Sequence, residues 1–303
     1  MRYPSSEMTG SDPPLRNVSD TALLVAVHRA RESERADALF HDPYARALAG
    51  ERGERIAREL ASGVSGWPVV ARTLFFDEVI ARMARSGRIG CVLNLAAGLD
   101  ARPYRLDLPG DLLWVEADLP DMLEYKVERL ANETPHCLLE RVAGDLNDPL
   151  ARGRAADATA QRSTLVVTEG LLVYLAKEDV VGLARDLAAR ANFDHWLLDI
   201  SSPQAISWGK RGKLGRQLKS ANASHRFAPA AGFEFFRPYG WQPVEVASLW
   251  EEARRLDRLP GFLKLLEAIT PRTRREPYHS LNRVGLLQRP QELTVDTGLG
   301  QRS

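Results

Sequence analysis

Five short, largely apolar runs dominate the middle of the chain, and stretches with a helical pattern separate them. These runs are Cys91–Ala96, Leu112–Val115, Cys137–Val142, Thr164–Thr168 and His195–Ile200. Continuous apolar runs are typical of strands buried on both faces, and their alternation with helices indicates βαβ units around a mostly parallel sheet. Pro243–Ala247 and Ser280–Leu287 predict two more strands, the second at an antiparallel end. The sequence therefore predicts a doubly wound α/β domain.

Helical patterns also precede the first of these runs. Val18–Arg35 and Ala71–Arg85 are helical in pattern, and another helix is expected to begin at Asp42-Pro43, because Asp caps helices well and Pro suits the first helical position. These segments predict an N-terminal helical cap.

The domain boundaries follow from composition. Residues 1–17 are polar and rich in Pro and Ser, which predicts a flexible tail. One domain is expected over residues 18–290, with an inserted lid at about 203–240. Residues 291–303 are expected to form a C-terminal tail.

The charge of the chain is nearly balanced. The 41 Lys and Arg residues oppose 40 Asp and Glu residues, which gives a net charge of +1 and predicts no global attraction to nucleic acid or anionic membranes. No apolar stretch approaches the roughly 20 residues of a membrane-spanning helix, and the N-terminus lacks the apolar core of a secretory signal. Cys91 and Cys137 lie in apolar surroundings and imply no disulfide framework. We therefore expect a cytoplasmic protein.

The turn after the first apolar run reads Ala96-Ala97-Gly98. It contains one glycine and does not match the G-x-G-x-x-G pattern of dinucleotide-binding turns. A turn of small residues lets a ligand lie against the backbone, and the absence of a dense phosphate nest favours a ligand such as S-adenosylmethionine over a nicotinamide dinucleotide. The alternative is a plain tight turn without a ligand.

Acidic residues follow three successive predicted strands. Asp118 comes 20 residues after Gly98, the spacing at which an acid accepts hydrogen bonds from ribose hydroxyls. Asp145 and Glu169 follow the next two strands, so the three carboxylates are expected at one edge of the sheet. In the alternative interpretation, Glu116 and Asp118 are solubility charges or a helix cap, and acids are simply common in such turns.

Several motifs in a fixed order resemble a known family. They are VSDTALLVAVHRARE, ALFHDPYARALAG, ARTLFFDEVI, VLNLAAGLDARPYRL, VEADLPDMLEYK, GDL and TEGLLVYL. The resemblance, over roughly residues 18–190, is to the leucine carboxyl methyltransferase-like family, and within it to a bacterial branch of S-adenosylmethionine-dependent O-methyltransferases associated with polyketide tailoring. It implies a Rossmann-like, seven-stranded methyltransferase sheet with S-adenosylmethionine as the cofactor.

The resemblance implies roles for the residues that follow the first three predicted strands. Gly98 would pass against the methionyl moiety and Asp118 would hold the ribose. Asp145 and Leu146 would frame the adenine.

The same resemblance implies roles near the methionyl part. Arg72 would bind the methionyl carboxylate, with Arg29 as a second contact, and Glu169 would lie close to the sulfonium. The alternative for Arg72 is a helix-surface arginine. The family has a second glycine where this chain has Ala96, whose methyl group is expected to crowd the cofactor. Ala96→Gly is therefore expected to preserve or improve affinity, at a cost in folding stability.

A basic, glycine-containing segment, Trp208–Lys219, is the candidate lid. Its cations are Lys210, Arg211, Lys213, Arg216 and Lys219. They could form a mobile flap that attracts an anionic acceptor, and the alternative is a solvated loop. A nucleic-acid partner is disfavoured because aromatic residues are sparse around the segment. The chain has no metal-ligand spacing of histidines and no G-x-S-x-G motif, which argues against a metal site and against a hydrolase.

The predicted function is O-methylation of a small-molecule acceptor by S-adenosylmethionine. No catalytic residue could be named, and because a carboxylate needs no general base, a carboxyl acceptor is slightly preferred over a phenol. Two alternatives stay open: a non-catalytic or regulatory S-adenosylmethionine-binding protein, and a nicotinamide-dependent Rossmann oxidoreductase. The oligomeric state is not predicted.

Overall fold

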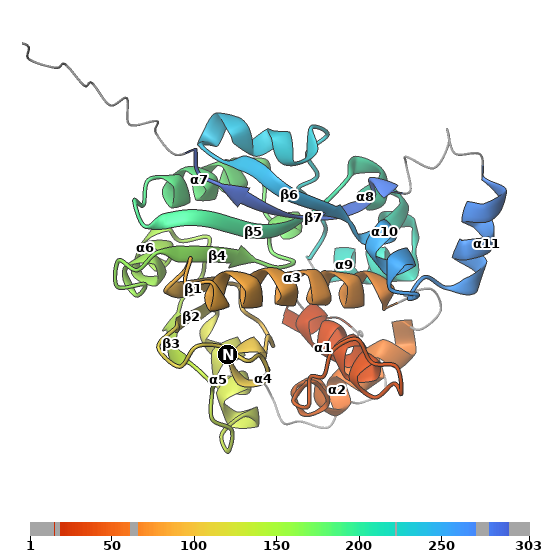
Figure 1. The fold of residues 1–303 in the computed structure, drawn as a ribbon. Helices are drawn as coiled ribbons and strands as arrows, with labels where there is room; N and C mark the ends of the chain where they lie inside the picture. The colour runs from red at the N-terminus through yellow and green to blue at the C-terminus, as the bar shows by residue number, and fades with distance from the viewer. Residues whose placement is uncertain (1–14, 16–18, 61–65, 222, 271–278, 291–303) are drawn as a thin grey trace, which may run out of the picture.

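The centre of the protein is a sheet of seven strands. The computed structural model describes residues 15, 19–60, 66–221, 223–270 and 279–290. The strands are β1 (Cys91–Leu95), β2 (Leu113–Asp118), β3 (Leu138–Ala143), β4 (Thr164–Thr168), β5 (Phe193–Ser201), β6 (Gln242–Ser248) and β7 (Asn282–Gln288). They lie in the order β3-β2-β1-β4-β5-β7-β6. Strands β1 to β5 pair in parallel, and β7 runs antiparallel to both β5 and β6. The predicted doubly wound, Rossmann-like sheet is confirmed (Figure 1).

Helices cover both faces of this sheet. The helices are α1 (Ser19–Ser33), α2 (Ala45–Leu60), α3 (Trp67–Arg85), α4 (Arg102–Arg105), α5 (Pro120–Arg129), α6 (Pro149–Asp157), α7 (Lys177–Ala188), α8 (Pro203–Arg211), α9 (Lys213–Ser220), α10 (Leu249–Arg255) and α11 (Gly261–Ile269), with 3₁₀ helices η1 (Leu172–Tyr174) and η2 (Gly232–Tyr239). One core joins α6, α7 and η2 to the sheet, and a second joins α3 and α10 to the opposite face. The side chains of β1 and β4 are buried on both sides, which explains why their runs are largely apolar rather than alternating.

The N-terminal helices form the predicted cap. A third core holds α1 and α2 against the turn after β1 and against α4, α5 and α9, and Figure 1 shows α1 and α2 grouped below α3. Leu15 is fully buried in this core, so the expectation of a loose tail is wrong at that residue. The rest of the predicted tails, residues 1–14, 16–17 and 291–303, lies outside the described residues.

The predicted lid is helical rather than a loop. Helices α8 and α9 occupy its first half, and η2 lies in its second half. A Cβ atom at Gly215 would clash with the backbone of Gly209 and Lys210, so this glycine allows α9 to approach α8 closely. In the sequence, the glycines between the cations of this segment suggest backbone freedom for a mobile flap; at Gly215 that interpretation is wrong. Leu218 on α9 is buried in the cap core.

Two further sequence expectations concern cysteines and membranes. Cys91 and Cys137 are both buried and unpaired, and burial raises the pKa of their thiols to about 12 and about 11. Within the described ranges, no helix combines the length and apolar character that a bilayer crossing requires.

Candidate functional site

A cavity of about 680 Å³ opens at the carboxyl edge of the parallel strands. The chain crosses here from β3 at one end of the sheet to β4 beyond β1, which makes this edge the switch point where ligands bind in doubly wound folds. The cavity is lined by all of the site residues expected from the sequence: Arg29, Arg72, Gly98, Asp118, Asp145, Leu146 and Glu169. The structure therefore brings them together, whatever each one binds.

Five polar side chains and one glycine follow the strand order along this edge. In the order β3, β2, β1, β4, β5 and β7, they are Asp145, Asp118, Gly98, Glu169, Asp199 and Asn282. The edge is thus a row of strand ends rather than a cluster around one point, which suits an elongated ligand with several polar groups.

Asp118, the last residue of β2, is hydrogen-bonded to the turn after β1. Its carboxylate accepts hydrogen bonds from the backbone N–H of Gly98 (2.6 Å) and of Leu119 (2.7 Å). Burial raises the pKa of Asp118 although both N–H groups oppose that shift. A carboxylate has about four acceptor directions, so the two used by the backbone leave two for a ligand.

The backbone of this turn is left-handed at two positions. Gly98 has φ +48°, and Ala96 has φ +57°. An L-residue in this region carries a backbone strain that glycine does not. The backbone at position 96 argues against the expectation that glycine there costs stability, because it has a conformation that glycine adopts without strain.

Asp145 and Leu146 lie at the exposed end of the row. The Asp145 side chain accepts hydrogen bonds from the backbone and side-chain N–H groups of Asn147, both at 2.9 Å. This turn fixes the carboxylate beside the cavity. Leu146 packs against the core that lies under α6 and α7.

Arg72 reaches across the sheet edge from α3. Its Nε donates to Glu169 Oε1 (3.0 Å) and its Nη1 donates to Asp199 Oδ2 (2.9 Å). Asp199 also accepts a hydrogen bond from the Gly170 backbone N–H at 2.6 Å. The alternative of a helix-surface arginine is wrong, because the side chain is 15% exposed and paired on two sides. Its Nη2 has no hydrogen-bond partner among the described residues and is left to donate to a ligand.

Arg102 does not line the cavity but joins carboxylates that do, and the sequence analysis missed it. It is fully buried and donates to Asp77 (2.6 Å), Asp100 (2.8 Å) and Glu169 (2.7 Å). Burial alone would raise the pKa of Glu169, but the adjacent guanidinium groups of Arg102 and Arg72 hold it below its usual range. Arg102 likewise holds the pKa of Asp100 well below its usual range against the effect of burial. Both carboxyl groups are therefore ionised at neutral pH.

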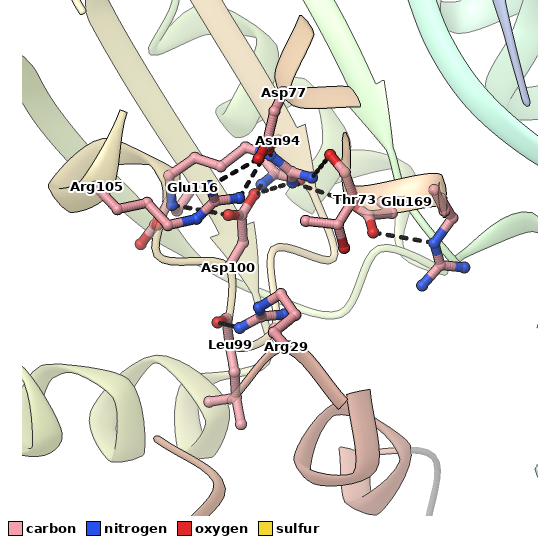
Figure 2. A network of polar contacts seen from close by, with 12 residues as sticks. Arg29, Thr73, Asp77, Asn94, Leu99, Asp100, Arg105, Glu116 and Glu169 are labelled. Carbon is pink, nitrogen blue, oxygen red and sulfur yellow. Dashed lines mark hydrogen bonds and ion pairs between the residues drawn. The ribbon is translucent and has the colours of Figure 1, made fainter. Parts of the chain in front are cut away.

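These contacts extend into a continuous ion-pair network behind the cavity, part of which Figure 2 shows. Its members are Arg29, Asp42, Arg105, Asp77, Arg102, Asp100, Glu169, Arg72 and Asp199. Each contacts the next along this sequence, except that Asp100 and Glu169 both contact Arg102. Removing one member of such a buried network leaves an uncompensated charge, which costs several kcal/mol. The network contains four guanidinium groups and five carboxylates, so it has a surplus of one negative charge.

Glu116 lies outside this row. It is fully buried and pairs with Lys126 Nζ (2.5 Å) and Arg141 Nε (3.0 Å). The interpretation of Glu116 as a solubility charge or helix cap is wrong. It belongs to a buried ion pair between β2, α5 and β3.

The comparisons with known proteins agree on one family. The family model for leucine carboxyl methyltransferase matches residues 22–188, more than half of the chain. A protein from Mycobacteroides abscessus named as an S-adenosyl-L-methionine-dependent methyltransferase is 33% identical over 80% of this chain and 88% of its own. A protein of the same name from Mycobacterium marinum is 33% identical over 84% of this chain and 89% of its own.

Solved structures show the same fold. A DUF574 family protein from Streptomyces avermitilis matches with a TM-score of 0.60 at 16% identity, over 89% of this chain and 97% of its own. A protein from Thermobifida fusca whose structure is described as that of a methyltransferase matches with a TM-score of 0.57 at 16% identity, over 92% of this chain and 96% of its own. The predicted family is confirmed, and the nicotinamide-dependent alternative falls away. The chain belongs to the leucine carboxyl methyltransferase family of S-adenosylmethionine-dependent methyltransferases.

Proposed function

We propose that this protein transfers the methyl group of S-adenosylmethionine to an oxygen atom of a small-molecule acceptor. The observation that supports this most directly is the extent of the cavity. It takes in every residue expected to bind the cofactor and continues past them to β5, β7 and the segment after α9. That continuation leaves room for a second ligand next to the first.

The residues present fit the cofactor. Asp118 has two free acceptor directions for ribose hydroxyls, and Arg72 has a free Nη2 for a carboxylate. The surplus negative charge of the ion-pair network suits a ligand whose ammonium, carboxylate and sulfonium groups sum to one positive charge. When bound, S-adenosylmethionine supplies an electrophilic methyl group. Methyl transfer then depends mainly on how well the acceptor oxygen is aligned with that methyl group.

Apolar and aromatic side chains from four helical elements line the cavity. Its lining includes Val25 on α1, Val69 on α3, Tyr174 on η1 and Leu218 on α9. Displacing water strengthens electrostatic interactions inside the site. In our proposal these side chains hold the acceptor and exclude water as a competing nucleophile.

The cations of α8 and α9 support a further proposal about the acceptor. Lys210, Arg211 and Arg216 are exposed, and residues 200–233 contain no Asp or Glu. If the acceptor is anionic, replacing Lys210 and Arg211 together with Gln should raise its KM, and added salt should raise it in the wild type, because exposed charges act over a Debye length of about 10 Å at 0.1 M. Cofactor affinity should not change. Equal salt sensitivity in both proteins contradicts an electrostatic role for these cations.

Two measurements test the proposed function. Calorimetry should show binding of S-adenosylmethionine and S-adenosylhomocysteine, and a labelled methyl group should then appear on an oxygen of some member of an acceptor library. Absence of binding refutes the proposal. Binding with no transfer to any acceptor favours the non-catalytic, regulatory alternative, and transfer to nitrogen or carbon refutes the assignment to oxygen.

A further inference from the structure

A second group of polar side chains lines the cavity beyond Arg72 and Glu169. They are Tyr174, Asp199, Ser201, His225 and Asn282. Ser201 Oγ donates to Asn282 Oδ1 at 2.8 Å, and Asp199 is already paired with Arg72. Of this group, His225 has the chemistry to accept a proton near neutral pH.

The structure holds His225 in a defined place. Its ring lies edge-on to the ring of Tyr174, with the centroids 5.3 Å apart and the planes at 70°. The next two residues, Arg226 and Phe227, both donate backbone hydrogen bonds to the Val173 carbonyl, at 2.7 and 3.3 Å. Phe227 is buried in the core that joins α6, α7 and η2 to the sheet. The segment after α9 is thereby tied to η1, which places the imidazole beside the cavity.

Both ring nitrogens of His225 are left for a ligand. Within the described part of the chain, neither has a hydrogen-bond partner, and neither is among the enclosed nitrogen atoms. The other histidine of the cavity, His28, differs in this respect. Its Nε2 is enclosed without a partner, and burial, with a smaller effect of Arg31, lowers its pKa to about 4. His28 is thus too weak a base for the same role.

The surroundings of His225 keep it uncharged. Burial lowers its pKa, Lys210 on α8 lowers it further, and Asp199 on β5 opposes both. Tyr174 contributes a neutral ring, because burial raises the pKa of its hydroxyl. Arg226, the adjacent residue, is exposed at the rim of the cavity. An uncharged imidazole with accessible nitrogens is ready to take a proton.

We propose that His225 is the general base of the reaction and that the acceptor is a phenol-like hydroxyl compound. This inference rests on the proposed function. A phenol has a pKa of about 10, so at neutral pH most of its molecules keep the hydroxyl proton, and a base must remove it during methyl transfer. A carboxylate is already ionised and would give His225 no proton to remove. The base that the sequence analysis did not find is thus supplied by the segment after α9, and the preference for a carboxyl acceptor is reversed.

The step balances without a further reactant. The acceptor oxygen forms a bond to the methyl carbon, the carbon–sulfur bond breaks with its electron pair on sulfur, and the hydroxyl proton passes to a ring nitrogen of His225. The imidazolium then releases that proton to water. A neutral thioether and a methyl ether are the products.

Matched pairs of acceptors test this assignment. Phenol, 4-methylphenol and 2-naphthol are compared with benzoate, 4-methylbenzoate and 2-naphthoate, using labelled S-adenosylmethionine and reading methyl ether against methyl ester between pH 5 and 9. We expect transfer to the hydroxyl compounds, at a rate that rises with pH through the lowered pKa of His225 and then levels, because only the uncharged imidazole accepts the proton. General base catalysis contributes about 10²–10⁴-fold, so His225→Gln should lower kcat by at least 100-fold and remove this rise.

Three controls separate this proposal from the proposed function and from a folding effect. S-adenosylhomocysteine should bind His225→Gln and the wild type within two-fold, and loss of binding in both would refute the proposed function rather than the base. His225→Ala should regain activity when imidazole is added. His41→Gln, an exposed histidine outside the cavity, should behave as the wild type. Transfer only to the carboxylates, transfer to no member of the panel, or an unchanged pH profile in His225→Gln would each overturn the assignment.

Discussion

Replacing Ala96 with glycine tests how the turn after β1 is strained and what it touches. Ala96 has φ +57°, and the adjacent Ala97 is buried without a positive φ. Left-handed backbone costs an L-residue about 1–2 kcal/mol, whereas glycine loses about 0.5–1 kcal/mol more conformational freedom than alanine on folding. These two costs differ by about 0–1.5 kcal/mol, so Ala96→Gly should raise the free energy of unfolding, by about 0.75 kcal/mol at the midpoints of the two ranges.

The neighbouring position provides the matched control. Ala97→Gly pays the same entropy without relieving strain and also loses a buried methyl group, so it should lower the free energy of unfolding by about 1–2 kcal/mol. Urea titrations of the two variants and the wild type measure these opposite signs, and calorimetry with S-adenosylhomocysteine measures affinity. Ala96→Gly should bind at least as tightly as the wild type, because the removed methyl group lines the cavity. Destabilisation equal to that of Ala97→Gly would refute the strain argument, and weaker binding by a folded Ala96→Gly would refute contact with the ligand.

Three other predictions concern the buried charges. Asp118→Ala should weaken S-adenosylhomocysteine binding 10- to 150-fold by calorimetry, because a hydrogen bond to a charged group contributes about 1.5–3 kcal/mol; unchanged affinity contradicts the ribose role. Lys126→Met should lower the free energy of unfolding by about 3 kcal/mol in urea, since Glu116 keeps Arg141 as its other partner; no change would mean that the pair is not needed. The guanidinium groups that lower the pKa of Glu169 in the folded protein stabilise the fold at a pH above about 4.3, the pKa of Glu169 in the unfolded chain. This stabilisation is lost as the pH falls through the lowered pKa of the folded protein. Thermal unfolding between pH 5 and 3 should therefore depend less on pH in Glu169→Gln than in the wild type.

The strands could be predicted closely because burial on both faces leaves a direct mark on the sequence. The run Thr164–Thr168 coincides with β4, and the predicted helix Ala71–Arg85 ends at the same residue as α3. Helices α8 and α9 could not be recognised in the same way. Their glycines look like loop residues in the sequence, while Gly215 is needed for close helix contact, a property that depends on the neighbouring helix.

The candidate site divides along similar lines. Asp118, Asp145 and Glu169 could be found because each lies within three residues after the end of a predicted strand. Asp199 lies inside the fifth run, one residue before its end, so this rule does not select it. Arg102 could not be found in this way. Its importance comes from partners on α3 and on the segments after β1 and β4, which only the folded chain brings together.

The position of β7 determines when the protein can finish folding. It is the last strand of the sheet to leave the ribosome, yet it lies between β5 and β6. Until residue 288 has emerged, the edges of β5 and β6 that β7 will pair with are open in the nascent chain. Open strand edges can pair with other chains. The cavity is also incomplete until β7 has formed, because Asn282 of this strand is part of the cavity lining. A chain interrupted before Asn282 should therefore aggregate during synthesis rather than accumulate as a folded protein without activity.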